Sequence, residues 1–143
     1  KLDLFSPDAS TEVDILYSQA ERHPLENLEP VLTHEEVVDL QTTVKSIRVE
    51  RSVARYMVDI VGRSRADSRL KLGVSPRGSL MLFRAAQAAA FAAGRDFVLP
   101  DDVQKVAPHV LPHRLILTSK AKYGNDNKAE IVAEILQQVP IPT

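Results

Sequence analysis

The stretch GVSPRGS, residues 73–79, holds the residue types and spacing that could do chemistry in this chain of 143 residues. It reads as a helix start, with Ser75 as N-cap and Pro76 at the first helical position. Arg77 is then the second helical residue, although unpaired N–H groups already make a helix start positive. A planar guanidinium beside such N–H groups suits a phosphate oxygen. From these residues alone, either Arg77 points into water or an anion binds beside it.

Two glycines in the same stretch have the spacing of a phosphate-binding P-loop. Gly73 and Gly78 match G-x-x-x-x-G, but Ser79 and Leu80 follow where that motif requires Lys and Ser or Thr. No hydrophobic strand precedes Gly73 either. We therefore interpret the spacing as unrelated to a P-loop.

Two histidines are the only candidate metal ligands with suitable spacing. His109 and His113 are four residues apart, but Pro112 disturbs the helix between them and no third ligand follows. We interpret both as structural residues and expect no metal site. The chain has no cysteine, so a thiol nucleophile is excluded, and no Ser-His-Asp set stands out.

Composition is that of one globular domain. Hydrophobic residues make up 44% and charged residues 26%, and no run is long and apolar enough to span a membrane. We find no signal-peptide pattern in these 143 residues, and the absence of cysteine is compatible with a reducing cytoplasm. The chain begins at Lys1 without Met, so we expect it to be a piece of a longer protein.

The charges are unevenly distributed. Residues 1–41 hold two basic and ten acidic residues, whereas residues 42–84 hold ten basic and three acidic ones. One interpretation is that the acidic and the basic segment form two helical layers whose oppositely charged faces attract each other. The other is a basic surface for phosphates or for an acidic neighbouring subunit. The overall pI of about 6.5 and the few aromatic residues argue against a nucleic-acid binder.

Helical patterns cover most of the chain, and they predict an all-α fold. We expect a bundle of five to six helices with a short extended N-terminal lead-in. The apolar stripes include Val37, Leu40, Val44 and Ile47 in one helix and Val53, Met57, Ile60 and Val61 in the next. The expected helices lie within residues 8–23, 32–47, 50–66, 75–94, 99–114 and 125–139. Residues 64–73 are predicted to be a loop, and residues 114–119 could be a short extended stretch.

Capping residues support these helix ends. Asp8 or Ser10 can cap the first helix, and Thr33 with Glu36 forms a capping box before the second. The Ala-rich helix after Pro76 is predicted to be central and to end at Gly94. Leu99 precedes a further helix start at Pro100 but cannot cap it with its side chain.

Residues 73–117 resemble the lid subdomain of MoxR-type AAA+ ATPases. The family pattern contains Ser-Pro-Arg, a long Ala-rich helix, Gly-Arg-Asp, Pro-x-Asp-Val and a His-Arg pair. Four positions depart from it: Val74 and Gly78 replace Ala, Phe97 replaces Tyr, and Leu99 replaces Thr. The matching residues are Gly73, Ser75, Pro76, Arg77, Gly94, Arg95, Asp96, Val98, Pro100, Asp102, Val103, His113 and Arg114.

The resemblance implies a role for Arg77. In the family, the Arg of Ser-Pro-Arg is the sensor 2 residue, which reaches the γ-phosphate of ATP held with Mg²⁺ by a preceding core. Arg77, supported by Ser75 and Pro76, would take that role here. The core motifs are absent, so this chain alone should not hydrolyse ATP. Residues 1–8 would be the end of the core or the exit from it, and residues 9–143 the helical lid.

The resemblance also implies partners. These are the chain's own ATPase core, neighbouring subunits of a homo-oligomeric ring, expected to be a hexamer, and partner proteins, often with von Willebrand A domains, that are remodelled in a chaperone-like way. A cytoplasmic location is expected. The residues leave open the role of the His113-Arg114 pair. The alternative function is a free-standing helical adaptor for protein interactions, without nucleotide chemistry.

Overall fold

The computed structural model describes residues 6–21, 25 and 28–142, without the side chains of residues 19–21. The chain divides into two compact units, residues 2–40 and residues 41–143, and each is described by itself. Residues 1–5 of the predicted N-terminal lead-in lie outside the described part.

The first unit contains α1 (Ala9–Glu21) and the beginning of α2 (His34–Ser46). Asp8 caps α1, because its carboxylate accepts the Thr11 N–H at 2.8 Å. The predicted capping box of α2 is confirmed: Glu36 accepts the Thr33 N–H at 2.7 Å, and the Thr33 hydroxyl accepts the Glu36 N–H at 3.2 Å. These hydrogen bonds lower the pKa of the Glu36 carboxyl, with the Thr33 N–H as the main cause.

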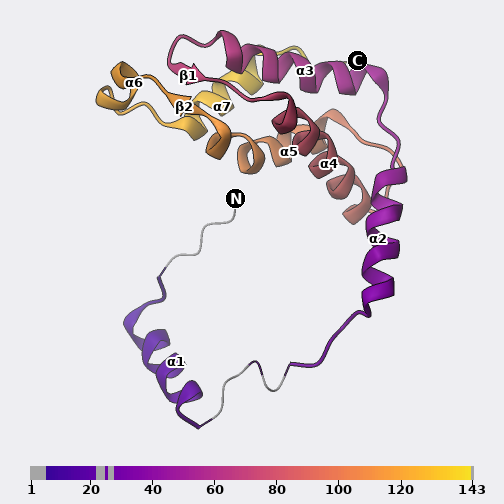
Figure 1. The fold of residues 1–143 in the computed structure, drawn as a ribbon, viewed down its shortest axis with the longest axis vertical. Helices are drawn as coiled ribbons and strands as arrows, with labels where there is room; N and C mark the ends of the chain where they lie inside the picture. Colours follow the sequence, from indigo (N-terminus) through magenta and orange to yellow (C-terminus); the bar gives the residue numbers. More distant parts are fainter. Residues whose placement is uncertain (1–5, 22–24, 26–27, 143) are drawn as a thin grey trace. The chain divides into compact units, whose positions relative to one another are not determined.

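The second unit contains the remaining helices and one small sheet (Figure 1). Its four long helices are α3, α4, α5 and α7, and α4 packs against both α3 and α5. The elements after α2 are α3 (Arg51–Ala66), β1 (Leu70–Leu72), α4 (Pro76–Ala92), α5 (Pro100–Val110), the 3-10 turn η2 (Pro112–Arg114), β2 (Ile116–Leu117), α6 (Ser119–Tyr123) and α7 (Lys128–Gln138).

Helix α4, which was predicted to be central, packs against α3 and α5, whereas α3 and α5 also contact α7; α4 is therefore not the central helix of this unit. Its alanines Ala86 and Ala90 are completely buried, and the absence of side-chain bulk lets the neighbouring helices approach closely. The helix ends in a Schellman motif, with Gly94 in the left-handed region at φ 73°. Arg95 N–H donates to Ala90 O at 3.0 Å and Gly94 N–H to Phe91 O at 2.9 Å. The predicted stop at Gly94 is therefore confirmed.

The predicted all-α class is confirmed, and one local prediction needs correction. The described residues form seven α-helices, where about five to six were expected; the additional helix is the five-residue α6, which follows the cap Thr118. The predicted loop at 64–73 contains β1, which pairs antiparallel with β2, Leu70 opposite Leu117 and Leu72 opposite Ile116. Strand β2 lies within the stretch 114–119 that was expected to be extended, whereas the three residues of β1 are too few for periodicity to reveal a strand. In the described part of the chain, no helix is long and apolar enough to cross a membrane.

Candidate anion-contact site at the start of helix α4

The first turn of α4 has the predicted capping geometry. Ser75 lies outside the helix at φ −72° and ψ 164°, and its hydroxyl accepts the Gly78 N–H at 3.4 Å. Pro76 occupies the first helical position. The Gly78 and Ser79 N–H groups also donate to the Ser75 carbonyl, at 2.8 and 3.2 Å. Ser75 and Pro76 therefore fix the position of the next residue, Arg77.

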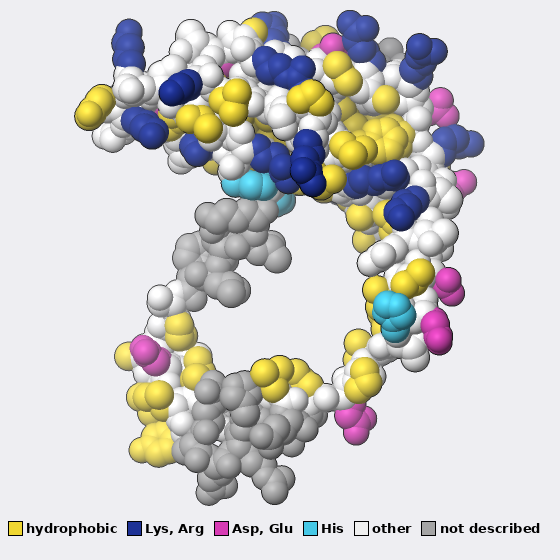
Figure 2. Space-filling model, in the orientation of Figure 1, with side chains coloured by type: hydrophobic (Ala, Val, Ile, Leu, Met, Phe, Trp, Pro, Cys, Tyr) yellow, Lys and Arg dark blue, Asp and Glu magenta, His cyan; other side chains and the backbone are white. Residues whose placement is uncertain are grey.

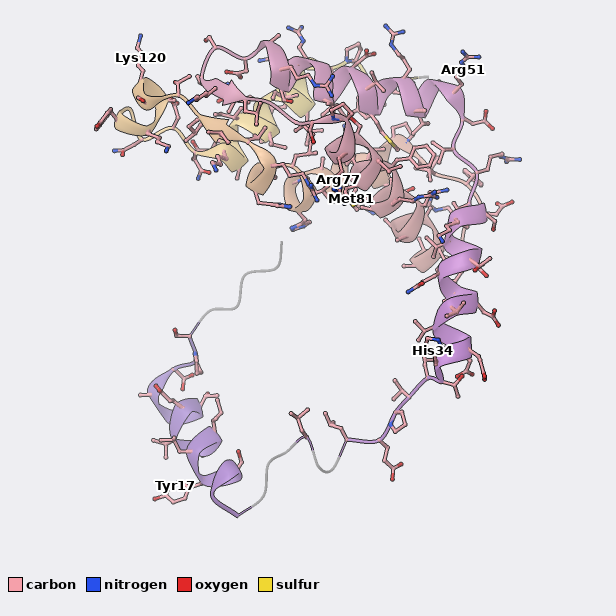
Figure 3. All side chains as sticks on the ribbon, viewed as in Figure 1. Tyr17, His34, Arg51, Arg77, Met81 and Lys120 are labelled. Atoms are coloured by element: carbon pink, nitrogen blue, oxygen red, sulfur yellow. The ribbon has the colours of Figure 1, made fainter. Side chains whose placement is uncertain are left out.

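Arg77 carries hydrogen-bond donors without partners. Its side chain is exposed, and it makes no hydrogen bond or ion pair with any residue in the described ranges. Its backbone N–H belongs to the first turn, whose N–H groups have no acceptor within a helix. Figure 3 shows Arg77 and Met81 one turn apart on α4. A guanidinium and an N–H thus stand beside one helix start, a combination that suits a phosphate oxygen.

Helix α3 holds the residue that precedes the cap. The buried Ser64 hydroxyl accepts the Val74 N–H at 3.0 Å and donates to Val61 O at 2.7 Å. Arg65 Nε donates to Val74 O at 2.8 Å. Both backbone polar groups of Val74 are therefore bonded to one turn of α3. This anchor fixes where α4 begins and so where Arg77 emerges.

Gly73 serves packing rather than phosphate binding. A Cβ at this position would lie 2.5 Å from Ser64 O and 2.7 Å from the Arg65 Cα and N atoms, all backbone. Only glycine lets the chain approach α3 so closely. The interpretation of G-x-x-x-x-G as unrelated to a P-loop agrees with this arrangement.

Gly78 and Val74 fit together in the same way. A Cβ at Gly78 would overlap Val74 Cγ1 and lie 3.4 Å from Arg114 Cδ. The family pattern has Ala at both positions, so the larger Val74 side chain occupies the space that a methyl group at position 78 would use. The contact also places the half-buried Arg114 over the first turn of α4, where its Nε donates to Val110 O at 3.2 Å.

We expect Gly78→Ala to destabilise the fold by about 1–2 kcal/mol, because overpacking outweighs the usual helix gain from alanine. Val74→Ala creates a small cavity and should also destabilise. In the double variant, the new methyl group at position 78 enters the space that Val74 vacates. The free energy of unfolding of the double variant should therefore be about 1 kcal/mol higher than the value expected if the two single losses simply added. Urea unfolding of the four proteins measures this coupling. Additive effects would show that the two positions are independent.

Sequence reasoning did not identify Ser64, Arg65 and Arg114 as neighbours of this site. Ser64 and Arg65 lie in the basic segment 42–84, where no motif or spacing sets them apart from their neighbours. The sequence also does not indicate a role for Arg114. Their contacts join α3 and η2 to α4. Helical periodicity within one segment gives no information about contacts between different segments. The only local signal of this site in the sequence is an arginine that follows a Gly-x-Ser-Pro turn.

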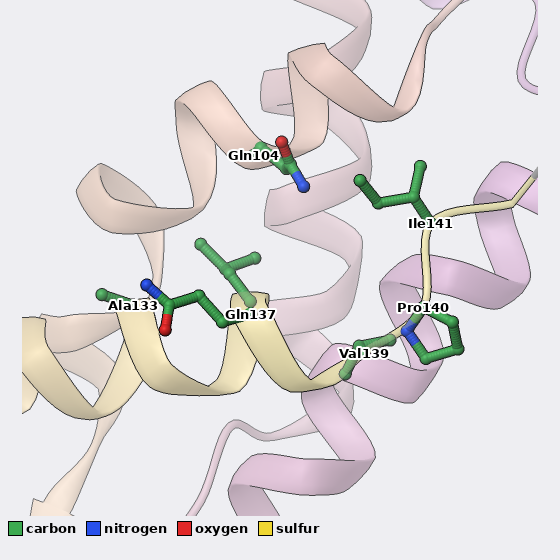
Figure 4. Close-up of a pocket in the computed structure, with 7 residues that line it drawn as sticks. Gln104, Ala133, Gln137, Val139, Pro140 and Ile141 are labelled. Atoms are coloured by element: carbon green, nitrogen blue, oxygen red, sulfur yellow. The ribbon is translucent and has the colours of Figure 1, made fainter.

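Other features of the described residues do not offer a competing site. No group of three or more His, Asp or Glu side chains there could hold a metal ion. A hollow of about 530 Å³ lies between α5, α7 and the C-terminal segment (Figure 4). It is lined by uncharged residues: Gln104, Ala133, Leu136, Gln137, Val139, Pro140 and Ile141. It contains no group that would act as an acid, base or cation.

Comparison with known proteins identifies the class of this domain. The model of the AAA lid domain family matches residues 62–135. A solved structure of an ATPase candidate from Cytophaga hutchinsonii superposes with a TM-score of 0.83 at 24% identity, over 98% of this chain and 45% of that one. At that identity, the likeness shows the fold alone.

Three curated relatives are similar to this chain, and two of them carry the name MoxR. "Uncharacterized protein YeaC" of Bacillus subtilis is 43% identical over 99% of this chain and 44% of its own length. "Chaperone MoxR1" of Mycobacterium tuberculosis is 30% identical over 99% of this chain and 40% of its own length. "Protein MoxR" of Paracoccus denitrificans is 52% identical over 32% of this chain and 14% of its own length. The chain thus spans less than half the length of these relatives. It belongs to the AAA lid domain family, as a lid of the MoxR type of AAA+ ATPase.

Proposed function

We propose that this domain closes over ATP bound to an ATPase core of the same protein, and that Arg77 is its sensor 2 residue. Ser75 and Pro76 form the turn that presents Arg77. The observation that carries the proposal is the exposed Arg77 with unpaired donors, at a helix start that α3 holds by both Val74 backbone groups. Membership of the AAA lid family supports the proposal, because AAA+ ATPases use ATP and Mg²⁺.

The proposed contribution of Arg77 is electrostatic. Phosphoryl transfer needs positioning and stabilisation of charge on the transferred phosphoryl oxygens, and a fixed guanidinium provides both. The nucleotide and its Mg²⁺ would be held by the core. This chain supplies the guanidinium and the rigid helix start, and Ser64 and Arg65 limit how far that start can move.

The same contact would couple the lid to the state of the nucleotide. Arg77 would bind the γ-phosphate before hydrolysis and lose that partner once phosphate leaves. A ligand shifts a conformational equilibrium only through such a difference between two states. The lid position would therefore report on the nucleotide.

The oligomeric assembly and the partner proteins are proposed by analogy with the family. AAA+ family membership supports an oligomeric ring, which we propose to be a hexamer in the cytoplasm. The printed name "Chaperone MoxR1" supports chaperone-like remodelling of partner proteins, which we extend to proteins with von Willebrand A domains. We also propose that residues 9–143 are the lid and residues 1–8 the exit from the core.

Characterising the full-length gene product tests this function. We expect about 200 further residues before Lys1, by analogy with the family, with G-x-x-x-x-G-K-[ST] and a downstream Asp-Glu pair. The purified full-length protein should hydrolyse ATP in the presence of Mg²⁺. A native product without these motifs and without ATPase activity would favour the adaptor function instead.

A further inference from the structure

Arg114 brings a second guanidinium to the first turn of α4. Its Cδ would lie 3.4 Å from a Cβ at Gly78, the residue directly after Arg77, so the Arg114 side chain packs on the backbone of that turn. The guanidinium follows directly on Cδ and therefore lies beside the same turn. Arginines from two elements, α4 and η2, are thus placed at one helix start.

The Arg114 side chain is held in place by only part of its guanidinium. It is half-buried, and its Nε donates to the carbonyl oxygen of Val110, the last residue of α5, at 3.2 Å. This bond satisfies one of the carbonyls that a helix end leaves without a partner. Its two Nη groups donate to no residue within the described ranges. Stabilisation of the α5 end therefore accounts for Nε alone, and the Nη donors are available to a ligand.

Among the described residues, no carboxylate pairs with the arginines at the α4 start. Arg65, Arg77 and Arg114 make no ion pair there. The arginines that do form ion pairs in this part of the chain are Arg48, Arg55, Arg69 and Arg95. Figure 2 shows Lys and Arg side chains gathered on one face of residues 41–143, with few acidic ones between them. Like charges beside the positive end of a helix repel each other, and a bound anion relieves that repulsion.

We propose that Arg114 is a second phosphate-binding residue of this site, and that it contacts the phosphate chain of the nucleotide together with Arg77. This inference rests on the proposed nucleotide role of the domain. Two guanidiniums supply more charge-assisted donors than one, and phosphate oxygens accept several such hydrogen bonds. Because Nε ties Arg114 to the end of α5, its Nη groups are positioned before the nucleotide binds. A contact made equally in the ground state and the transition state changes affinity rather than kcat. Arg114 therefore acts on nucleotide binding, whereas Arg77 acts on turnover.

Arg114→Gln in the full-length protein tests this contact. Glutamine keeps N–H donors but removes the charge, so the Kd of a labelled, non-hydrolysable ATP analogue with Mg²⁺ should rise about 10-fold. Raising the ionic strength should weaken binding to this variant less than binding to the wild type, because one screened contact between a cation and phosphate is gone. Arg114→Lys keeps the charge, so its Kd should lie between those of the wild type and Arg114→Gln. The control Arg63→Gln removes the same charge from an exposed position on α3 and should leave both the Kd and its salt dependence unchanged.

A purely structural role of Arg114 gives different results. Loss of the bond to Val110 alone would lower the free energy of unfolding in urea and leave the salt dependence of binding as in the wild type. That outcome would overturn the inference, as would a Kd within about 2-fold of wild type or an Arg114→Lys variant that binds no better than Arg114→Gln. The proposed function would still stand in these cases if Arg77→Ala strongly lowers turnover. If Arg77→Ala and Arg114→Gln both bind and hydrolyse ATP as the wild type does, the proposed function fails together with this inference.

Discussion

Arg77→Ala in the full-length protein is expected to lower kcat for ATP hydrolysis by about 100-fold or more. Removal of one donor that stabilises transition-state charge typically costs that much. Nucleotide affinity should fall less, because one guanidinium is a small part of an ATP site and the core supplies the rest. Steady-state hydrolysis and equilibrium binding of a labelled ATP analogue separate the two effects.

Two matched variants sharpen this experiment. Arg63→Ala removes the same charge from an exposed position on α3 that lies beside the segment 138–140 and should leave kcat within about 2-fold of wild type. Arg77→Lys keeps the charge but loses the planar fork of donors, so its kcat should lie between those of the wild type and Arg77→Ala. If Arg77→Ala hydrolyses ATP at a rate close to wild type, Arg77 is not a phosphate sensor.

The start and end of α4 could be predicted from sequence because their causes are local. Ser75 supplies a side-chain acceptor, Pro76 presets the first helical φ, and Gly94 tolerates the left-handed region. Each effect acts within one turn of the residue concerned. The exposure of Arg77 followed from the same local geometry, since the second helical position extends beyond the cap.

The framework around Arg77 could not be predicted in this way. Ser64 and Arg65 reach Val74 only after the chain reverses through β1, and Arg114 reaches Gly78 from η2. Neither contact has a periodic signature. The departures from the family pattern at Val74 and Gly78 were visible in the sequence, but their mutual compensation depends on a side-chain contact that spacing does not report.

The apolar stripe of α2 shows a different limit. Periodicity predicted one apolar stripe through Val37, Leu40, Val44 and Ile47. In the structure Ile47 is buried and Val44 is half-buried, whereas Val37 and Leu40 are exposed at 38% each. Ile47 and Val44 belong to the compact unit 41–143, whose helix α4 holds the end of α2 through Gln87 Nε2 and Ile47 O at 2.6 Å. A stripe identifies an apolar face but does not say which partner covers it.

Asp102→Asn is expected to destabilise the domain by about 2–3 kcal/mol at pH 7. The Asp102 carboxylate side chain is 3% exposed and accepts hydrogen bonds from Arg95 Nη2 at 2.6 Å, Arg95 Nη1 at 2.8 Å and the Leu99 N–H at 2.8 Å. It thereby supplies half of a capping box for α5, where Leu99 has no side-chain acceptor. Breaking a buried pair costs about 3–5 kcal/mol, and we expect a smaller loss here because the Arg95 side chain is 24% exposed and water screens its charge.

The pH dependence of this loss separates the charge of Asp102 from its shape. Hydrogen bonds from Arg95, with a smaller contribution from the Leu99 N–H, hold the pKa of the Asp102 carboxyl below its ordinary value. A depressed folded pKa contributes stability above the unfolded value of about 3.9, and that contribution disappears as the pH falls through the folded pKa. The gap in unfolding free energy between wild type and Asp102→Asn should therefore be full at pH 7 and pH 5 and shrink below about pH 4. Urea unfolding of both proteins at pH 7, 5 and 3 measures it. A gap that stays constant down to pH 3 would mean that the amide disturbs packing and that the Arg95 ion pair contributes little.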